Sequence, residues 1–269
     1  MPHFRVITWN CRRAIGISKV WDYLLDIAPD VAFLQEVNAI PSQVLDIYAC
    51  HKHRAIGKDD KAQRFNTVLL VKGHIGEPIH LQSNTDWVQS ELQRFEGNLV
   101  ACELLPHNAP PIKAICVYSP AWPVDPSRLV GIDVSDVRLT LNRNVWVADL
   151  LWASLNHRRI SANDRWIVAG DLNLSETFDS LTGGPRGNRE YLNRMASLGL
   201  TECLRNAKGA LTPTFRSPRG GAIKHQIDHM FVTEALASQL VTCDTGSGDH
   251  VFGSGISDHL PIIADFDFG

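Results

Sequence analysis

Five short stretches of the 269-residue chain place acidic, amide or imidazole side chains at or just after an apolar run. In residues 166–173 (WIVAGDLN), four apolar residues lead into Gly170, and Asp171 and Asn173 follow. Because these two residues are two apart, their side chains leave the same face of an extended chain. A buried strand that carries two polar groups at its end is typical of a catalytic site, although a strand followed by an ordinary Asp/Asn turn has the same pattern.

The other stretches lie toward the two ends of the chain, at residues 6–10 (VITWN), 33–36 (FLQE), 226–229 (QIDH) and 257–261 (SDHLP). They contribute Asn10, Glu36, Asp228, Asp258 and His259. Mg²⁺ takes oxygen ligands and is usually held by one or two carboxylates, with water and substrate phosphate completing the shell. Glu36 is the best candidate ligand, and the alternative is a solvated acid that begins a loop.

Strand-like and helix-like segments alternate along the chain and determine how these groups are positioned. Strands are expected at 5–10, 31–35, 67–72, 99–105, 112–118 and 166–171, as a pair of strands ending at 231–233, and at 260–266. Helices are expected at 19–27, 40–45, 138–155, 189–198 and 234–240. Some strands stand alone between helices, whereas 67–118 holds consecutive ones. This order predicts two packed mixed sheets flanked by helices, in a single domain spanning residues 1–269.

Six motifs, in order, resemble those of the endonuclease/exonuclease/phosphatase superfamily: TWN ending at Asn10, LQE ending at Glu36, VYSP around Tyr118, GDLN at 170–173, IDH around Asp228 and SDHLP at 257–261. Any one of them is weak, but together they span almost the whole chain. The resemblance implies an α/β fold, a four-layer αββα sandwich, with its site at one edge of the two sheets. It also implies divalent-metal-dependent cleavage of phosphate esters, with Mg²⁺ as the cofactor and Mn²⁺ as an alternative.

The resemblance also implies roles for single residues. Asn10 and Asp258 would join Glu36 near the metal, Asp171 would orient or deprotonate the attacking water, and Asn173 would donate to a phosphoryl oxygen.

Three further residues are assigned roles in the same way. His259 would contact a non-bridging oxygen as an imidazolium, Asp228 would fix its orientation, and Tyr118 would donate to the phosphate or the leaving oxygen. The alternatives are a histidine that caps the last strand and a core tyrosine.

The chain departs from the family at Arg12, where some members of the apurinic-endonuclease branch carry an acid. An arginine there argues against a second metal and suggests a cation that faces a substrate phosphate, although Arg12 and Arg13 also suit a solvated turn. Tyr118 leans toward that same branch. The loop from Pro120 to Pro126 lacks the branch's usual Asn after the proline, so abasic-site specificity is not carried over.

A basic stretch precedes Asp228. Residues 205–225 contain no acid, and Arg216, Arg219 and Lys224 are the candidate substrate-binding cations. If these cations contact phosphates, replacing them should make polynucleotide binding depend less steeply on salt concentration. The alternative is a solvated hairpin built around Gly220 and Gly221.

The bulk composition limits the choice of function. The net charge of −3 provides no global basic field, so a polyanion site must be a local patch. The scattered cysteines suit reduced thiols, and the sequence shows neither a secretory signal nor a membrane span, so a cytoplasmic protein is expected. The leading hypothesis is a nuclease acting on DNA or RNA. The alternatives are a hydrolase of a small phosphate ester, such as a phospholipid headgroup or inositol phosphate, and an inactive binding protein on the same fold.

Overall fold

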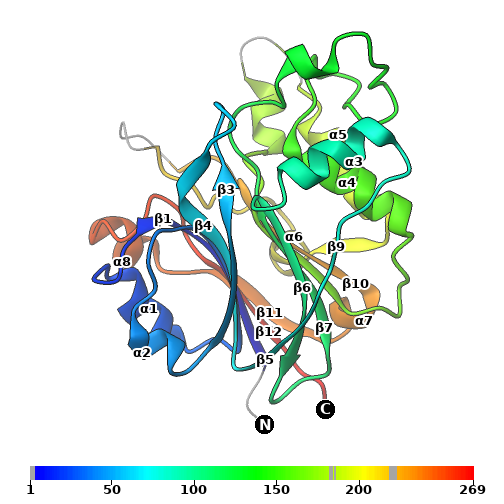
Figure 1. Cartoon of the computed structure of the whole chain (residues 1–269). Helices are drawn as coiled ribbons and strands as arrows, with labels where there is room; N and C mark the ends of the chain where they lie inside the picture. Colours follow the sequence, from blue (N-terminus) through cyan, green and yellow to red (C-terminus); the bar gives the residue numbers. More distant parts are fainter. Residues whose placement is uncertain (1–3, 182–183, 185, 218–222) are drawn as a thin grey trace.

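The computed structural model describes residues 4–181, 184, 186–217 and 223–269. Within these residues the strands form two six-stranded sheets that face each other (Figure 1). The first sheet has the order β11-β12-β1-β2-β4-β3. Its strands are β1 (Phe4–Ala14), β2 (Val31–Val37), β3 (Ala49–Ile56), β4 (Ala62–Val71), β11 (Leu240–Thr245) and β12 (Ile262–Phe266). The segments before residue 72 and after residue 239 therefore build one sheet together.

The second sheet comes from the middle of the chain and has the order β5-β6-β7-β8-β10-β9. Its strands are β5 (Gly73–Pro78), β6 (Leu99–Pro106), β7 (Ile112–Tyr118), β8 (Trp166–Asp171), β9 (Leu200–Glu202) and β10 (Asp228–Thr233). Both sheets are mixed, because β1 runs parallel to β2 and β7 runs parallel to β8, whereas the other neighbours are antiparallel.

Helices cover the outer face of each sheet and complete four layers (Figure 1). α1 (Val20–Ile27), α2 (Ser42–Leu45) and α8 (Gly248–Gly253) pack on the first sheet. α3 (Asp86–Arg94), α4 (Val147–Arg158) and α5 (Asn188–Ser197) pack on the second. The remaining short elements are α6 (Cys203–Lys208), α7 (Glu234–Ala237) and the 3₁₀ turns η1 (Pro126–Leu129) and η2 (Glu176–Ser180). The predicted αββα sandwich is confirmed.

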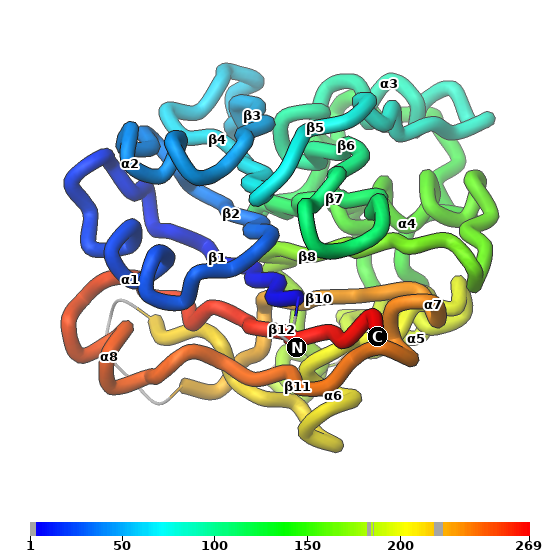
Figure 2. The backbone as a smooth tube through the Cα atoms, turned by 90° about the horizontal axis from the view of Figure 1, so that it is seen from below, coloured from blue at the N-terminus to red at the C-terminus, as the bar shows by residue number. Residues whose placement is uncertain are grey.

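The central strands are buried on both faces. In β1, Phe4 and Val6 join the core between the sheets, while Ile7 and Trp9 join the core under α1 and α8. The alternation follows from the period-2 direction of side chains along a strand. β12 lies beside β1 with Phe266 opposite Phe4, and Figure 2 shows this return of the chain to its first strand. The two ends of the described chain are thereby held in one sheet.

The expected helix over 138–155 is wrong in its first half, because α4 begins only at Val147. Polar side chains in the preceding segment bind the backbone locally instead: Asn142 Oδ1 accepts from the N–H of Asn144, and Glu190 accepts from the N–H of Thr140. Such bonds compete with helical ones. The helix expected over 234–240 ends at Ala237, since Leu240 begins β11. The strands β3, β5 and β11 and the helices α3, α6 and α8 were not predicted.

Candidate active site

The ends of four strands meet at one edge of the two sheets. Asn10 lies opposite Gln35 in the parallel pair β1–β2, so Glu36 follows at the same edge. Tyr118 lies opposite Asp171 in the parallel pair β7–β8. Parallel strands present their carboxyl ends on the same side of a sheet, where α/β proteins carry their sites. The Nδ2 group of Asn10 donates to Asp171 Oδ2 at 3.0 Å, so the two sheets contribute to one site.

Asp171 is a buried carboxylate surrounded by amide donors. Besides the bond from Asn10, its Oδ1 accepts from the N–H of Asn173 at 2.9 Å, and its Oδ2 accepts from Asn173 Nδ2 at 3.1 Å. Burial raises the pKa of Asp171 to about 7, with the charge of Asp228 adding to the shift, while His259 and the amide donors oppose it. A carboxylate whose pKa lies near neutrality can exchange a proton with water.

Asn173 has both hydrogens of its side-chain amide engaged. Nδ2 donates to the carbonyl oxygen of Ser119 at 2.8 Å as well as to Asp171. Its expected donation to a phosphoryl oxygen therefore requires one of these bonds to be exchanged. In the observed geometry Asn173 orients Asp171.

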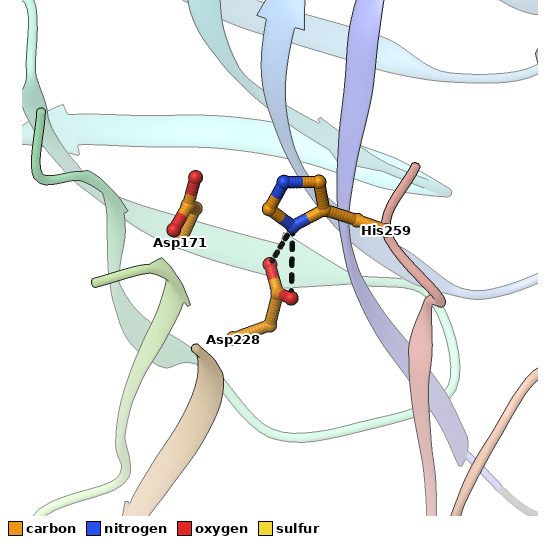
Figure 3. Close-up of side chains that lie close together, drawn as sticks. All are labelled: Asp171, Asp228 and His259. Carbon is orange, nitrogen blue, oxygen red and sulfur yellow. Dashed lines mark hydrogen bonds and ion pairs between the residues drawn. The ribbon is translucent and has the colours of Figure 1, made fainter. Parts of the chain in front are cut away.

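His259 and Asp228 form a buried ion pair on the other side of the site (Figure 3). His259 Nδ1 donates to Asp228 Oδ1 at 3.1 Å and to Oδ2 at 2.9 Å. Burial opposes the imidazolium, but the charge and hydrogen bond of Asp228, together with Asp171 and Asp258, raise the pKa of His259 to about 10. His259 is therefore protonated at neutral pH. Asp171 lies beside this pair in the same close-up (Figure 3).

Two hydroxyl groups hold this pair in place. Thr214 Oγ1 donates to Asp228 Oδ2 at 2.6 Å. Ser257 Oγ accepts from the N–H of His259 at 3.1 Å and donates to the carbonyl oxygen of Asn10 at 2.7 Å. The indole N–H of Trp9 donates to the carbonyl oxygen of His259 at 2.8 Å. No role was predicted for Thr214, Ser257 or Trp9 from the sequence. The only signal for them was their position within or near the motifs.

Tyr118 is half-buried beside Glu36 and is not a plain core residue. Burial raises the pKa of its hydroxyl, and the negative charges of Glu36 and Asp171 and a hydrogen bond with Glu36 raise it further. The Phe65 ring contacts the Tyr118 ring edge-on at 5.2 Å between centroids. Tyr118 is therefore a neutral donor at any ordinary pH, and Phe65, which the sequence analysis did not identify, limits how its ring can turn.

The backbone is strained around this edge. Arg12, Arg13, Glu36 and Asn173 have φ values of 46°, 58°, 55° and 50°. Non-glycine residues seldom adopt this left-handed region, and such strain tends to occur at functional sites. The turn at Arg12 is held by its own N–H, which donates to Asn10 Oδ1 at 3.0 Å.

The expected metal ligands Glu36, Asn10 and Asp258 offer two carboxylates and one amide oxygen, which suits a hard divalent cation. Asn10 directs Nδ2 toward Asp171, so its oxygen faces away from that carboxylate. The closest group of acidic and imidazole side chains among the described residues is instead Asp171, Asp228 and His259, within 4.8 Å of one another. A protonated His259 has no lone pair to offer a metal, so this second group suits charge and proton transfer better.

Of the cations predicted to contact substrate, Arg12 and Arg216 line a pocket together with Asp258. Arg12 is exposed, with its Nε 4.0 Å from Asp258 Oδ2. Arg216 is exposed, and its guanidinium lies 5.9 Å from the centre of the Phe252 ring. Lys224 is also exposed, and Arg219 lies outside the described residues. Elsewhere in the basic stretch, Arg205 pairs with Glu176 and Lys208 pairs with Asp244, so these two cations are engaged within the protein.

The model of the Endonuclease/Exonuclease/phosphatase family matches residues 7–259, and the chain belongs to this family. Its members are hydrolytic enzymes, and the nucleases among them use divalent metals. No protein with a curated description matches the chain.

Solved structures share the whole fold at low sequence identity. An AP endonuclease from Archaeoglobus fulgidus superposes with a TM-score of 0.70 and 16% identity, covering 98% of this chain and 99% of its own. A 3′ phosphatase from Neisseria, bound to a product DNA hairpin, superposes with a TM-score of 0.68 and 18% identity, and the match covers 98% of this chain and 100% of the phosphatase chain. An AP endonuclease from Leishmania major superposes with a TM-score of 0.67 and 19% identity, and the match covers 99% of this chain and 88% of the endonuclease chain. Among the described residues, no helix combines the length and apolar character needed to cross a bilayer.

Proposed function

We propose that this chain hydrolyses phosphodiester bonds in DNA or RNA with the help of a divalent metal, Mg²⁺ or Mn²⁺. The observation that carries the proposal is the buried Asp171, with a pKa of about 7, facing a His259 imidazolium whose partner is Asp228. A proton acceptor beside a fixed positive charge is what attack of water on a phosphate requires. We also propose that residues 1–269 act as one domain and that the protein works in the cytoplasm.

In this proposal Glu36, Asn10 and Asp258 hold the metal. When bound, the metal neutralises phosphate charge. Asp171, oriented by Asn10 and Asn173, takes a proton from the attacking water. His259 donates from Nε2 to a non-bridging oxygen, since Nδ1 is fixed by Asp228. Tyr118 stays neutral and donates a hydrogen bond from its hydroxyl to the phosphate or the leaving oxygen.

The substrate is proposed to be a polynucleotide because the exposed cations Arg12 and Arg216 line a pocket with Asp258, and the exposed Lys224 precedes Asp228 by four residues in the sequence. Arg219 belongs to the same proposal, although it lies outside the described residues. Related solved structures include a phosphatase bound to DNA, which supports the same choice. The acidic net charge of −3 favours the second candidate, a small phosphate ester.

The test is a panel of labelled single- and double-stranded DNA, RNA, abasic duplex, sphingomyelin and inositol phosphates, each with Mg²⁺, Mn²⁺ or chelator. We expect cleavage of a nucleic acid that chelator abolishes. Asp171→Asn should lower the rate roughly 10²–10⁴-fold, whereas Asp86→Asn, which changes an exposed carboxylate at the start of α3, should leave it unaltered. Cleavage of inositol phosphate or sphingomyelin alone would replace the polynucleotide by a small ester.

The metal ligands are tested separately. Glu36→Gln keeps the shape of the side chain but removes its charge, so it should raise the metal concentration that gives half the maximal rate. If Glu36 is a ligand, this weaker metal binding should be seen with both Mg²⁺ and Mn²⁺. Unchanged metal dependence in this variant would remove Glu36 from the ligand set.

A further inference from the structure

One buried amide group connects three strands that carry residues of the candidate site. Gln35 has an exposed fraction of 0%. Its Nε2 group donates to Thr8 Oγ1 at 3.4 Å, to the carbonyl oxygen of Phe33 at 3.1 Å and to Cys116 Sγ at 3.2 Å. These acceptors belong to β1, β2 and β7 in turn, so a single side chain joins the two sheets.

Each of the three strands carries a residue of the candidate site just beyond this contact. β1 reaches Asn10 two residues after its contact with the amide, and β7 reaches Tyr118 two residues after its own. In β2, Glu36 is the next residue after Gln35. Side chains two residues apart leave the same face of a strand, about 6.6 Å from each other along it. The amide therefore lies one layer below the side chains that form the site.

The backbone at residues 35–36 is released from β4. The regular pairing of β2 with β4 stops at Leu34 and resumes with a shifted register at Val37. Two residues of β2 thereby oppose only Thr67, which is the arrangement of a β-bulge. Within this bulge Glu36 has a φ of 55°, and backbone of this kind persists only where surrounding contacts fix it. The amide of the preceding residue joins the bulge to the opposite sheet.

Packing alone does not account for an amide at this position. The Oε1 atom of Gln35 is buried and has no hydrogen-bond partner among the described residues. An unpaired buried oxygen bears its desolvation cost, which offsets the bonds that the Nε2 group donates. An apolar side chain of the same length would therefore fill this space at little loss of stability. What it could not supply is the directed contact with β1 and β7.

We propose that Gln35 is a positioning residue for the metal site. Its amide fixes the bulge against β1 and β7, and so determines where Glu36 and Asn10 lie relative to Tyr118. This inference rests on the proposed metal-dependent function, and it adds a residue that sets how tightly the metal is held. Groups that orient the ligands of a metal typically change its affinity roughly 10–100-fold.

The test measures Mn²⁺ binding without substrate by electron paramagnetic resonance, in the wild-type protein and in Gln35→Met. Methionine has the same unbranched shape as glutamine but no amide. We expect the Kd for Mn²⁺ to rise roughly 10–100-fold. The midpoint of chemical denaturation should hardly move, because the unpaired oxygen is removed together with the donated bonds. An unaltered Kd, or a lower midpoint with an unaltered Kd for the folded protein, would overturn the inference.

Kinetics provide a second measurement on the same variant. At saturating Mn²⁺, Gln35→Met should still lower kcat for bis(p-nitrophenyl) phosphate, because Tyr118 is no longer held at its place on β7. The KM for a polynucleotide should be unaltered, since Arg216 and Lys224 have no contact with this amide. A change in KM alone would contradict a role in positioning the site.

Thr67→Val is the matched control. Thr67 lies opposite the bulge and is as buried as Gln35, and its hydroxyl has no partner among the described residues. Valine replaces that hydroxyl by a methyl group of similar size, so the Kd for Mn²⁺ and kcat should be unaltered. A rise in Kd as large as that of Gln35→Met would overturn the inference, because any change at the bulge would then disturb the metal.

Cys116→Ala covers the case in which Gln35→Met does not fold. It removes one acceptor of the amide, so the Kd for Mn²⁺ should rise about two- to tenfold, the loss of one hydrogen bond. In the double variant the two losses should not multiply, because both single changes remove the same bond. An unaltered Kd in Cys116→Ala, or losses that multiply, would overturn the inference.

The two proposals can fail separately. Weaker Mn²⁺ binding by Gln35→Met, in a protein that cleaves no nucleic acid, would overturn the nuclease function and support the positioning role. Cleavage of nucleic acid, with the same Mn²⁺ affinity in Gln35→Met as in the wild type, would overturn the positioning role alone. A wild-type protein that binds no Mn²⁺ would overturn both.

Discussion

The pKa values of Asp171 and His259 are both raised, but between about pH 7 and pH 10 the first side chain has lost its proton and the second still carries one. Asp171 is raised mainly by burial, so it gives up its proton near neutral pH. His259 keeps its proton to about pH 10 because Asp228 outweighs the effect of burial. One side chain is therefore available as a base over the same pH range in which the other carries a positive charge.

The first prediction concerns the pH profile of kcat/KM, which reports on groups of the free enzyme. The rate should rise as pH increases through about 7, where Asp171 loses its proton, and fall above about 10, where His259 loses its own. Asp228→Asn removes the negative charge that attracts the imidazolium but leaves His259 buried, so the pKa of His259 should drop. The loss of rate at high pH should then begin at least about one pH unit lower. An alkaline fall that stays in place would show that Asp228 does not set this pKa.

The second prediction concerns Asp228 and His259 as a unit. Asp228→Asn and His259→Ala should each lower kcat roughly 10²–10⁴-fold, and the double variant should lose less than the product of the two losses. The physical reason is that Asp228 acts through the imidazole that it orients. Losses that multiply in single-turnover kinetics would contradict the pairing, and circular dichroism of each variant is the control for folding.

At the scale of the elements, the position of Asp171 depends on how closely β8 approaches β7. Gly170 has a φ of 154°, and a Cβ at this position would collide with the carbonyl oxygen of Val117. Only glycine allows the two strands to pair here, one residue before the candidate base. Gly170 belongs to the motif at residues 170–173, and the close contact between β7 and β8 is the physical reason for a glycine there.

The third prediction follows from this contact. Gly170→Ala should lower the free energy of unfolding by about 1–3 kcal/mol through overpacking and should displace Asp171 from its amide donors. Chemical denaturation and kcat measure the two effects. Gly199→Ala is the control, since Gly199 also has a positive φ, of 78°, but has nothing within 4 Å of an added Cβ. Equal losses of kcat in both variants would mean that the strand contact does not position Asp171.

The elements also show what a sequence pattern can predict. The strand at 166–171 was predicted because an unbroken apolar run ends in polar residues, and it corresponds to β8. The edge strand β3 was missed because its central residues 51–54 (HKHR) are all polar and only Ala55 is buried, so no alternation was visible. The bond from Ser257 to Asn10 joins residues 247 apart, and only the packing of the two sheets reveals it. The strands that carry the motifs were predictable from their apolar runs, whereas the long-range hydrogen bonds between the motifs were not.

At the scale of the whole molecule, a negatively charged protein is proposed to bind a polyanion, so the contact must be local. The fourth prediction is that Arg216→Ser with Lys224→Ser flattens the log-log salt dependence of polynucleotide binding by about 1.4–1.8 units. Turnover of bis(p-nitrophenyl) phosphate should hardly change, because this small diester reaches only the central groups.

Lys72→Ser is the control for this prediction. Lys72 follows β4, which runs antiparallel to β2, so it lies at the opposite end of the sheet from Glu36. It should leave the salt slope unaltered. A slope that does not change in the double variant would support the solvated-hairpin alternative for this stretch, and equal damage to the small diester would mean that the two cations shape the site itself.

The first sheet cannot be completed until β11 and β12 return to β1 (Figure 2). During synthesis the strands β1 and β2 emerge early, but their neighbour β12 begins only at Ile262. His259 and its partner Asp228, from the second sheet, meet Asn10 and Glu36 only after that return. A nascent chain on the ribosome therefore carries only half of the candidate site for most of its translation, and the site is assembled only after residues 259–266 have been made.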